Sequence, residues 1–523
     1  VCVYVTASGL SQFSTLSLSL RLSLSLCLSL SLSLSLSLSL SLSLSVSRSL
    51  SLSLCASVCG CVFPQVPVSG AMGVRVLLLL LLLLLLAAVL SLAHSGGGAE
   101  QRFWWISDIH MDAHYAPQAS PSTFCHTADA PALGRSMRET PIRGSAVGWA
   151  RAGNHSSPWG QYGCDPPQEM VESALDFMLL NNPSPSFLVM GGDFSAHYSD
   201  SLSLVQSQIS SVTEIFTSRF PNTTMFFALG NDDFYPDYDF EENDVQFQWL
   251  YTRWQSILPP SAKDTFLRGG YYSSVPMTGL RMVVLNSVVY STHHQVRQNA
   301  RARRGGARTT DDEDPLGQFA FLRQELMTAR TNKQAVYILS HIPLGGDNYN
   351  QKPFFVAEYM TTMKGILLEF QDVIVAMLSG HTHQDDFRLL YTDGEATVVD
   401  ILSPSISTSN SNNPSVREVV FSPQLGYELL DWRQYIFDLY QANILNSPTW
   451  LVEYDLLMAY EMMDGPSPRG FQQLARALES DVRVFNQWSG FYATMFHPKR
   501  AEFRCAHLVT DNAAYAKCIG DIQ

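Results

Sequence analysis

Five short motifs in the middle of the chain carry side chains that commonly bind metal ions. Each motif follows an apolar run that has the length of a buried strand. In chain order the motifs are Asp108-Ile109-His110, Gly192-Asp193, Gly230-Asn231, Ser340-His341 and Gly380-His381-Thr382-His383. Because catalytic residues of open α/β sheets gather at the carboxyl ends of the strands, these distant motifs are expected to converge at one edge.

The residue types suit a pair of divalent ions. Carboxylate, imidazole and carboxamide groups are ligands that Zn²⁺, Mn²⁺ and iron accept, and one carboxylate can bridge two ions. Such a pair binds phosphate oxygens and lowers the pKa of a bridging water, so that hydroxide attacks phosphorus in line. A lone strand-end aspartate is commonly a turn or helix cap. The complete ordered set, in contrast, predicts a two-metal phosphoester hydrolase.

The segments around the motifs alternate between strand and helix patterns. Buried strands are predicted at Phe103–Ser107, Phe187–Met190, Met225–Leu229, Met282–Asn286, Ala335–Ser340 and Val373–Leu378. Amphipathic helices are predicted at Gln168–Leu180, Leu202–Arg219, Asp244–Ile257, Gln318–Arg330 and Val356–Phe370. This alternation implies an α/β sheet covered by helices. We expect a catalytic domain over residues 100–425 and a helical region over 426–523, with helices at Ser447–Met463 and Phe471–Tyr492.

The charge balance excludes one class of partner. The 523 residues include 33 Lys and Arg against 47 Asp and Glu, and residues 1–95 contain three arginines and no acidic residue. The remainder of the chain is therefore strongly acidic. Because binding to a nucleic-acid duplex needs a basic surface, such binding is not expected. An anionic substrate can bind only at a local site such as a metal centre.

The first 95 residues differ from the rest. Residues 1–71 contain a long Leu-Ser alternation that no packed core needs, and a CT repeat read in frame encodes this pattern; we interpret them as mistranslated and dispensable. Met72 then precedes Arg75, ten leucines and small residues, the pattern of a signal peptide over residues 72–95. An uncleaved anchor over Val76–Leu92 is the alternative, since this run is close to spanning length.

Cysteine usage and glycosylation motifs agree with secretion. Four of the nine cysteines lie beyond residue 71, at Cys125, Cys164, Cys505 and Cys518. Their spacing suggests Cys125–Cys164 and Cys505–Cys518 bridges, although the sequence alone allows three connectivities. Sequons begin at Asn154 and Asn222. We therefore expect a secreted or lysosomal protein.

Short sequence segments around the motifs, called words here, resemble those of one family. The ordered set is the signature of the calcineurin-like metallophosphoesterases, and five words are similar to those of the acid sphingomyelinase-like phosphodiesterases. These words are FWWISDIHMD at Phe103–Asp112, GQYGCDP at Gly160–Pro166, ALGNDDFYP at Ala228–Pro236, GGYYS at Gly269–Ser273 and GQFAFLRQEL at Gly317–Leu326. The resemblance implies a β-sandwich flanked by helices, with a helical C-terminal region.

The resemblance also implies a ligand set. It places Asp108, His110 and His383 on one metal ion, Asn231, His341 and His381 on the other, and Asp193 between them. Two divalent ions, with zinc as the expected metal, are the implied cofactors. His197, four residues after Asp193, matches a histidine that the family places near the phosphate and the leaving group; a surface-loop histidine is the alternative.

One position departs from the family pattern. The family word is G-N-H-D, and here Asp232 and Asp233 follow Asn231, so the histidine that usually contacts the phosphate is absent. A carboxylate near a phosphate diester is repelled unless it is protonated or turned away, and two cations would lower the pKa of Asp232. His197 then becomes the leading general acid.

Three functions are compatible with these observations. The leading one is a secreted or lysosomal two-metal phosphodiesterase that acts on a small phosphoester or nucleotide through a metal-bridging hydroxide. A phosphoanhydride hydrolase resembling endopolyphosphatase and a catalytically impaired metal- and phosphate-binding protein are the alternatives, the last because of Asp232. With no lipid-extracting domain or stable membrane anchor expected, a water-soluble substrate is favoured over membrane sphingomyelin. A monomer is expected.

Overall fold

The computed structural model describes residues 100–127, 156–294, 313–348 and 351–492, together with six residues near the C-terminus. These six are Cys505, His507, Asn512, Ala514, Lys517 and Cys518. Residues His94–Gln523 form one compact unit. The predicted mistranslated segment at 1–71, the predicted signal peptide at 72–95 and the sequon at Asn154 lie outside the described residues.

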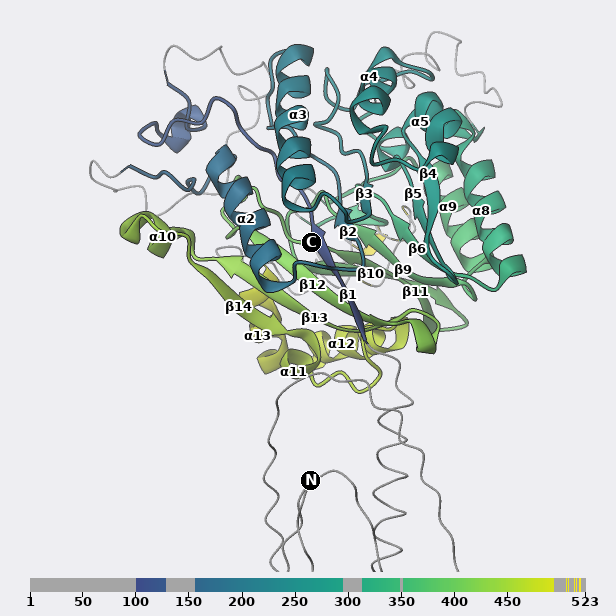
Figure 1. The fold of residues 1–523 in the computed structure, drawn as a ribbon. Coiled ribbons are helices and arrows are strands. Elements are labelled where there is room, and N and C mark those ends of the chain that lie inside the picture. The colour runs from purple at the N-terminus through teal and green to yellow at the C-terminus, as the bar shows by residue number, and fades with distance from the viewer. Residues whose placement is uncertain are drawn as a thin grey trace, which may run out of the picture. The chain divides into compact units, whose positions relative to one another are not determined.

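Two mixed six-stranded sheets form the centre of this unit (Figure 1). The first sheet has the order β14 (Trp450–Asp455), β13 (Glu428–Phe437), β12 (Ser415–Ser422), β1 (Gln101–Ile106), β2 (Leu188–Met190) and β3 (Met225–Phe227). The second has the order β10 (Asp386–Thr392), β11 (Glu395–Leu402), β9 (Ile374–Ser379), β6 (Ala335–Leu339), β5 (Leu280–Val284) and β4 (Tyr272–Met277). A short hairpin joins β7 (Gly346–Asp347) to β8 (Lys352–Pro353).

Each strand that precedes a candidate metal-binding motif pairs in parallel with at least one neighbour. β1, β2 and β3 are parallel in the first sheet, and β5, β6, β9 and β11 are parallel in the second. A parallel strand is covered on both faces, which explains why these strands are nearly continuous apolar runs in the sequence. Parallel pairing also brings their carboxyl ends to one edge of each sheet, and this edge carries the motifs.

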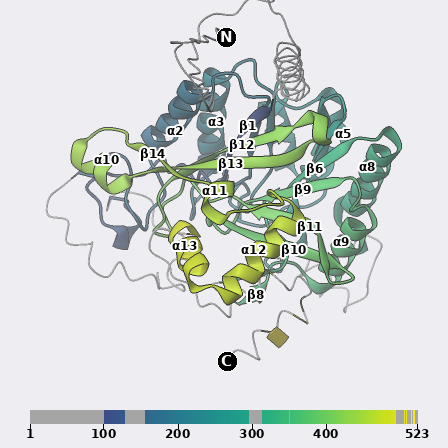
Figure 2. The ribbon, with the colours of Figure 1, turned by 90° about the horizontal axis from the view of Figure 1, so that it is seen from below.

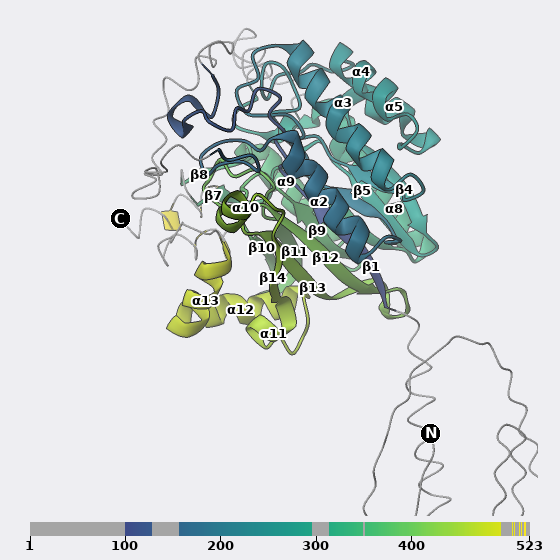
Figure 3. The ribbon, with the colours of Figure 1, turned by 60° about the vertical axis from the view of Figure 1, so that its left-hand side comes forward.

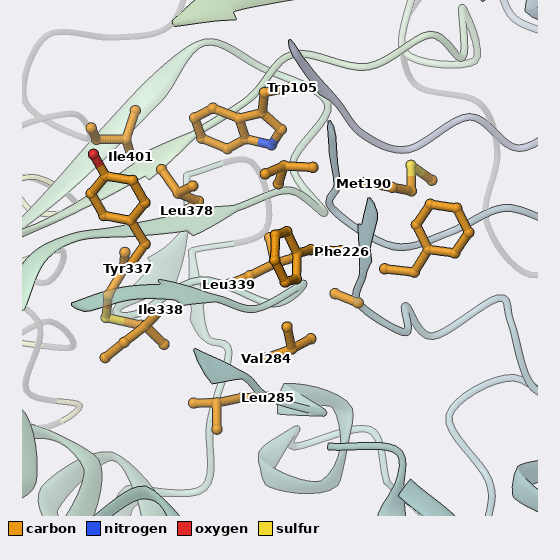
Figure 4. Close-up of a cluster of buried hydrophobic side chains, with 14 of the residues drawn as sticks. Trp105, Met190, Phe226, Val284, Leu285, Tyr337, Ile338, Leu339, Leu378 and Ile401 are labelled. Carbon is orange, nitrogen blue, oxygen red and sulfur yellow. The ribbon is translucent and has the colours of Figure 1, made fainter. Parts of the chain in front are cut away.

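The core lies between the two sheets and holds them face to face. Side chains from both sheets fill it, among them Trp105 of β1 and Leu378 of β9 (Figure 4). The ring of Phe103 lies 6.1 Å from that of Tyr337, a contact between β1 and β6. Burying aromatic rings of this size contributes strongly to the stability of the sandwich.

Helices cover the outer faces of the sheets. Their bounds are α2 (Gln168–Asn181), α3 (Leu202–Arg219), α4 (Val245–Trp254), α5 (Lys263–Gly269), α8 (Gln318–Asn332) and α9 (Ala357–Glu369). In Figure 3, α2 and α3 lie on the side of the first sheet and α8 on the side of the second. Phe177 of α2 contacts Trp104 of β1, and Phe216 of α3 contacts Phe227 of β3. The six strands and five helices predicted for this part of the chain are confirmed to within a few residues.

The C-terminal region contains helices and also two strands that the sequence did not predict. The helices are α10 (Leu439–Leu445), α11 (Leu456–Tyr460), α12 (Pro468–Ser480) and α13 (Val482–Tyr492), and α12 packs on β10 and β11 (Figure 2). The helix predicted at Ser447–Met463 is wrong, because β14 and the short α11 occupy most of this range. β14 is an edge strand whose apolar Leu451 and Val452 are exposed, so its sequence lacks the alternation of a half-buried strand.

The first sheet therefore continues well beyond residue 425.

Within the parts of the chain that the structure describes, no helix has both the length and the apolar character needed to cross a bilayer.

Candidate metal centre

The ends of β1, β2, β3, β6 and β9 bring the predicted ligands into one cluster. Three groups of side chains have possible ligand atoms within 4.8 Å of one another: His110, His197 and His383; Asp193, His341 and His381; and Asp108, His110 and Asp193. Asn231 joins them through Oδ1, which lies 3.2 Å from His341 Nε2. The structure thus assembles all seven candidate ligands, with His197 beside them.

One half of the cluster is formed by Asp108, His110 and His383. His110 Nε2 lies 3.1 Å from His383 Nε2 and 3.4 Å from Asp193 Oδ2. His383 Nε2 lies 3.6 Å from Asp108 Oδ1. The side chains of Asp108, His110, Asp193 and His383 are all buried.

The other half shares Asp193 with the first. His341 Nε2 lies 3.0 Å from Asp193 Oδ2, the same oxygen that faces His110. The ring of His381 lies 5.1 Å from that of His341. One carboxylate oxygen therefore belongs to both halves, as a bridging ligand must.

Hydrogen bonds outside the cluster orient the candidate ligands so that their nitrogen and oxygen donor atoms face inward. His110 Nδ1 lies 3.0 Å from the Ser195 carbonyl, and His341 Nδ1 lies 2.8 Å from the Gly191 carbonyl. With an N–H at each Nδ1, the Nε2 atoms point inward as free lone pairs. Asn231 donates its amide to Asp232, at 2.9 Å, which turns its Oδ1 toward His341. Nitrogen and oxygen atoms converge in this way on a common centre where a cation could bind.

The charges give an independent indication of a cation. Five aspartates in and beside the cluster are almost completely buried: Asp108, Asp165, Asp193, Asp232 and Asp233. Among the described residues, their ion pairs are with histidines and none is with lysine or arginine. Burying so many carboxyl groups without a lysine or arginine partner is costly. The residues present therefore fit divalent metal ions.

The titratable groups perturb one another strongly. Burial, reinforced by the Asp193 charge, raises the pKa of Asp108 to about 7. Burial would lower the pKa of His341, but the charge and hydrogen bond of Asp193 raise it to about 9. Burial and the charge of His197 hold the pKa of His110 well below its usual value, and the same two causes act on His383. In the protein alone, a proton on His341 therefore stands where a cation can bind.

The backbone around the ligands adopts an uncommon conformation. Five ligand positions have positive φ, between 47° and 70°: Asp108, His110, Asp193, His381 and His383. Non-glycine residues rarely adopt this region, and such residues cluster at functional sites because the surrounding structure holds them there. Glycines allow the close packing that this needs. A Cβ atom at Gly230 would collide with the Asp193 carboxylate, and one at Gly380 with the Asp108 carboxylate.

His197 lies at the edge of the cluster and is held by Asp165. Its ring stacks on that of His110 at 3.8 Å, and its Nδ1 lies 3.0 Å from both oxygens of Asp165. Burial would lower the pKa of His197, but the Asp165 charge and hydrogen bond outweigh it and raise the pKa. Ser407 donates to Asp165 at 2.7 Å. Asp165 and His110 therefore hold the His197 ring beside the candidate ligands.

Asp232 lies inside the site, with its carboxyl group near His110 and His197. Its Oδ2 is 3.8 Å from His110 Nδ1 and 4.0 Å from His197 Nε2. Burial, followed by the charge of Asp237, raises the pKa of Asp232 well above its usual value. Because the same oxygen accepts from Asn231, Asp232 orients a candidate ligand, a role that the sequence did not suggest.

Two further aspartates of the site were not singled out by the sequence reasoning. Asp233 accepts hydrogen bonds from the backbone N–H groups of Asp193, Phe194 and Gly230, at 2.7 to 3.0 Å, and so ties the β2 and β3 loops together. Asp165 orients His197. The only sequence signals were their places in the words GNDD and GQYGCDP.

Other predicted positions lie apart from the cluster. The structure has disulfides Cys125–Cys164 and Cys505–Cys518, with Cα atoms 5.9 Å and 5.7 Å apart. Asn222 is exposed in the turn before β3, where a glycan has room.

A sandwich of two mixed sheets, with aspartate, histidine and asparagine candidate ligands at the strand ends, fits a metal-dependent phosphoester hydrolase. The chain belongs to the calcineurin-like phosphoesterases, whose family pattern residues 101–385 match. Residues 396–523 match the C-terminal region of acid sphingomyelin phosphodiesterase. The chain is therefore a metal-dependent phosphodiesterase of the acid sphingomyelinase-like type, and the family expected from the sequence is confirmed.

Several characterised relatives cover most of the chain. Sphingomyelinase phosphodiesterase D of Dictyostelium discoideum is 29% identical over 341 residues, which are 64% of this chain and 75% of the relative. Cyclic GMP-AMP phosphodiesterase SMPDL3A of Homo sapiens is 28% identical over 444 residues, 80% of this chain and 90% of the relative. Acid sphingomyelinase-like phosphodiesterase 3b of Mus musculus is 28% identical over 441 residues, again 80% and 90%.

Proposed function

We propose that the protein is a two-zinc phosphodiesterase that cleaves small, water-soluble phosphodiesters such as cyclic dinucleotides. The convergence of ligand atoms from both halves of the cluster on Asp193 Oδ2 carries this proposal. The proposed ligands of one ion are Asp108, His110 and His383, those of the other are Asn231, His341 and His381, and Asp193 belongs to both. Divalent ions held by these residues would neutralise phosphate charge and activate a water for attack on phosphorus.

The chain's own residues supply the remaining chemistry. We assign His197 as the general acid that protonates the leaving oxygen, because Asp165 fixes its Nδ1 and leaves Nε2 directed into the site. An acid must hold its proton at the working pH, and the raised pKa of His197 favours this. Asp232 holds the Asn231 carboxamide in its ligand orientation.

The substrate class is supported by the relatives, which are named as phosphodiesterases and not as polyphosphatases. One relative is named for cleaving cyclic GMP-AMP, which supports a nucleotide substrate here. The disulfides and the exposed sequon at Asn222 support secretion or delivery to lysosomes.

A substrate panel with metal analysis tests this function. Purified protein is assayed on bis-p-nitrophenyl phosphate, a cyclic dinucleotide, ATP and polyphosphate, and its metal content is measured by elemental analysis. We expect two zinc ions per chain and higher kcat/KM on the diesters than on polyphosphate. Faster cleavage of polyphosphate would favour the phosphoanhydride hydrolase, and bound metal without turnover of any substrate would favour the impaired binding protein.

The Asp232→His variant tests the departure from the family pattern. A histidine can donate a proton to the leaving oxygen, so we expect higher turnover on a diester with a poor leaving group. A p-nitrophenyl ester scarcely needs protonation and should gain much less. Metal content is measured in parallel, because the substitution also removes the acceptor of the Asn231 amide. Loss of activity with both ions retained would show that the carboxyl group itself takes part in the reaction.

A further inference from the structure

Asp400 is a buried carboxylate near the metal-binding loops that the chemistry above does not use. It lies on β11 with 1% of its surface exposed. Its Oδ1 accepts a hydrogen bond from Ser379 Oγ at 2.6 Å, and its Oδ2 accepts one from the Leu344 backbone N–H at 2.9 Å. Both oxygens are therefore engaged, one by the residue that ends β9, before the His381–His383 loop, and the other by the loop that follows His341.

The two loops are those that carry three of the proposed ligands. Ser379 ends β9 and stands two residues before His381, and Leu344 follows His341 by three residues. The loops also contact each other, because the Gly380 N–H donates to the His341 carbonyl at 2.9 Å. Ser340 Oγ, beside His341, lies 3.0 Å from Ser379 Oγ. Asp400 thus completes a small polar network beneath the ligands.

Burying a carboxyl group at this position costs free energy of folding unless its hydrogen bonds compensate. Burial raises the pKa of Asp400 to about 6, although the hydrogen bonds from Ser379 and Leu344 and the Arg388 charge lower it. An apolar residue would avoid the burial cost, as β11 is otherwise largely apolar. The position is more than a generic core site, because its two acceptor oxygens match two donors on separate loops.

We infer that Asp400 is a positioning residue for the metal centre, which clamps the His341 loop to the His381–His383 loop through its two carboxylate oxygens. This inference rests on the proposed metal centre and deepens it. A single side chain held against both loops fixes the separation of imidazoles that must bind ions in defined positions. Substitution of a residue that orients metal ligands without binding the ion typically lowers metal affinity by about ten- to a hundredfold.

Metal retention in the full secreted protein tests the inference. Zinc affinity is measured by competition with a chelating zinc indicator for the unaltered protein, Asp400→Ala, Asp400→Asn and Ser379→Ala. We expect Asp400→Ala to bind zinc about ten- to a hundredfold more weakly. Ser379→Ala, which removes one of the two bonds, should change affinity less but in the same direction. Asp400→Asn keeps an acceptor oxygen and should lie closer to the unaltered protein.

Asp431→Ala is the matched control. Asp431 is a half-buried residue of β13 that, like Asp400, accepts two hydrogen bonds, here from the backbone N–H groups of Trp432 at 2.8 Å and Leu457 at 3.1 Å. The Asp431→Ala variant should lose stability but keep the zinc affinity of the unaltered protein. If Asp400→Ala does not fold, the zinc affinity of Ser379→Ala tests the inference. Unchanged zinc affinity in the folded Asp400 and Ser379 variants would overturn the inference, whereas an unaltered protein that binds no zinc would refute the proposed metal centre instead.

Discussion

The Asp193→Ala variant is expected to lose both metal ions and at least about a thousandfold in kcat/KM, since metal ions contribute several kcal/mol to such reactions. Asp193 Oδ2 faces His110 Nε2 at 3.4 Å and His341 Nε2 at 3.0 Å. Within the part of the chain that the structure describes, no other carboxylate appears in both candidate groups that Asp193 joins. Its removal therefore takes a ligand from each ion at once.

Elemental analysis of the purified variants measures this effect directly. Asn231→Ala and His110→Ala are the comparison variants, because each removes a proposed ligand of one ion and should mainly weaken that site. Asp193 also accepts from the Asp232 N–H through Oδ1, at 2.8 Å, so Asp193→Asn serves as a nearly isosteric variant that keeps an acceptor there. Two tightly bound ions in Asp193→Ala would defeat the assignment of a bridging carboxylate.

Part of this arrangement was predictable from sequence because short apolar strands end directly at the ligands. Trp105 and Ile106, for example, are buried in β1 immediately before the Asp108 motif. Strands β12 and β13 gave no such signal. Arg417 and Gln434 lie in them and are completely buried, paired with each other at 2.7 Å, so the polar letters hide the strand pattern.

The orienting residues were harder to predict because their partners are distant in the chain. Asp165 and Ser407 are separated by 242 residues, and Asp400 and Leu344 by 56. A lone aspartate in a sequence shows neither its burial nor its partner. Only the fold brings these carboxyl groups to the donors that give them a role, whereas ligands at strand ends follow a rule of topology.

His197→Ala is expected to reduce turnover by about 10²- to 10⁴-fold on a diester with a poor leaving group, the usual contribution of general acid catalysis. The alkoxide that leaves such a substrate needs a proton as the bond to phosphorus breaks. His197 is the candidate donor because Asp165 holds its Nδ1 at 3.0 Å and raises its pKa against the opposing effect of burial. With p-nitrophenolate as the leaving group, the loss should be much smaller.

The dependence on leaving group separates this role from a structural one. His197 also stacks on His110 at 3.8 Å, so its removal could disturb a metal ligand and slow every substrate alike. His126→Ala is a suitable control, because His126 lines the same pocket as His197 but pairs with Asp112, which is not a proposed ligand. It should leave the ratio of the two rates unchanged. An equal loss on both substrates in His197→Ala, accompanied by loss of zinc, would mean that His197 supports the metal centre and that another group delivers the proton.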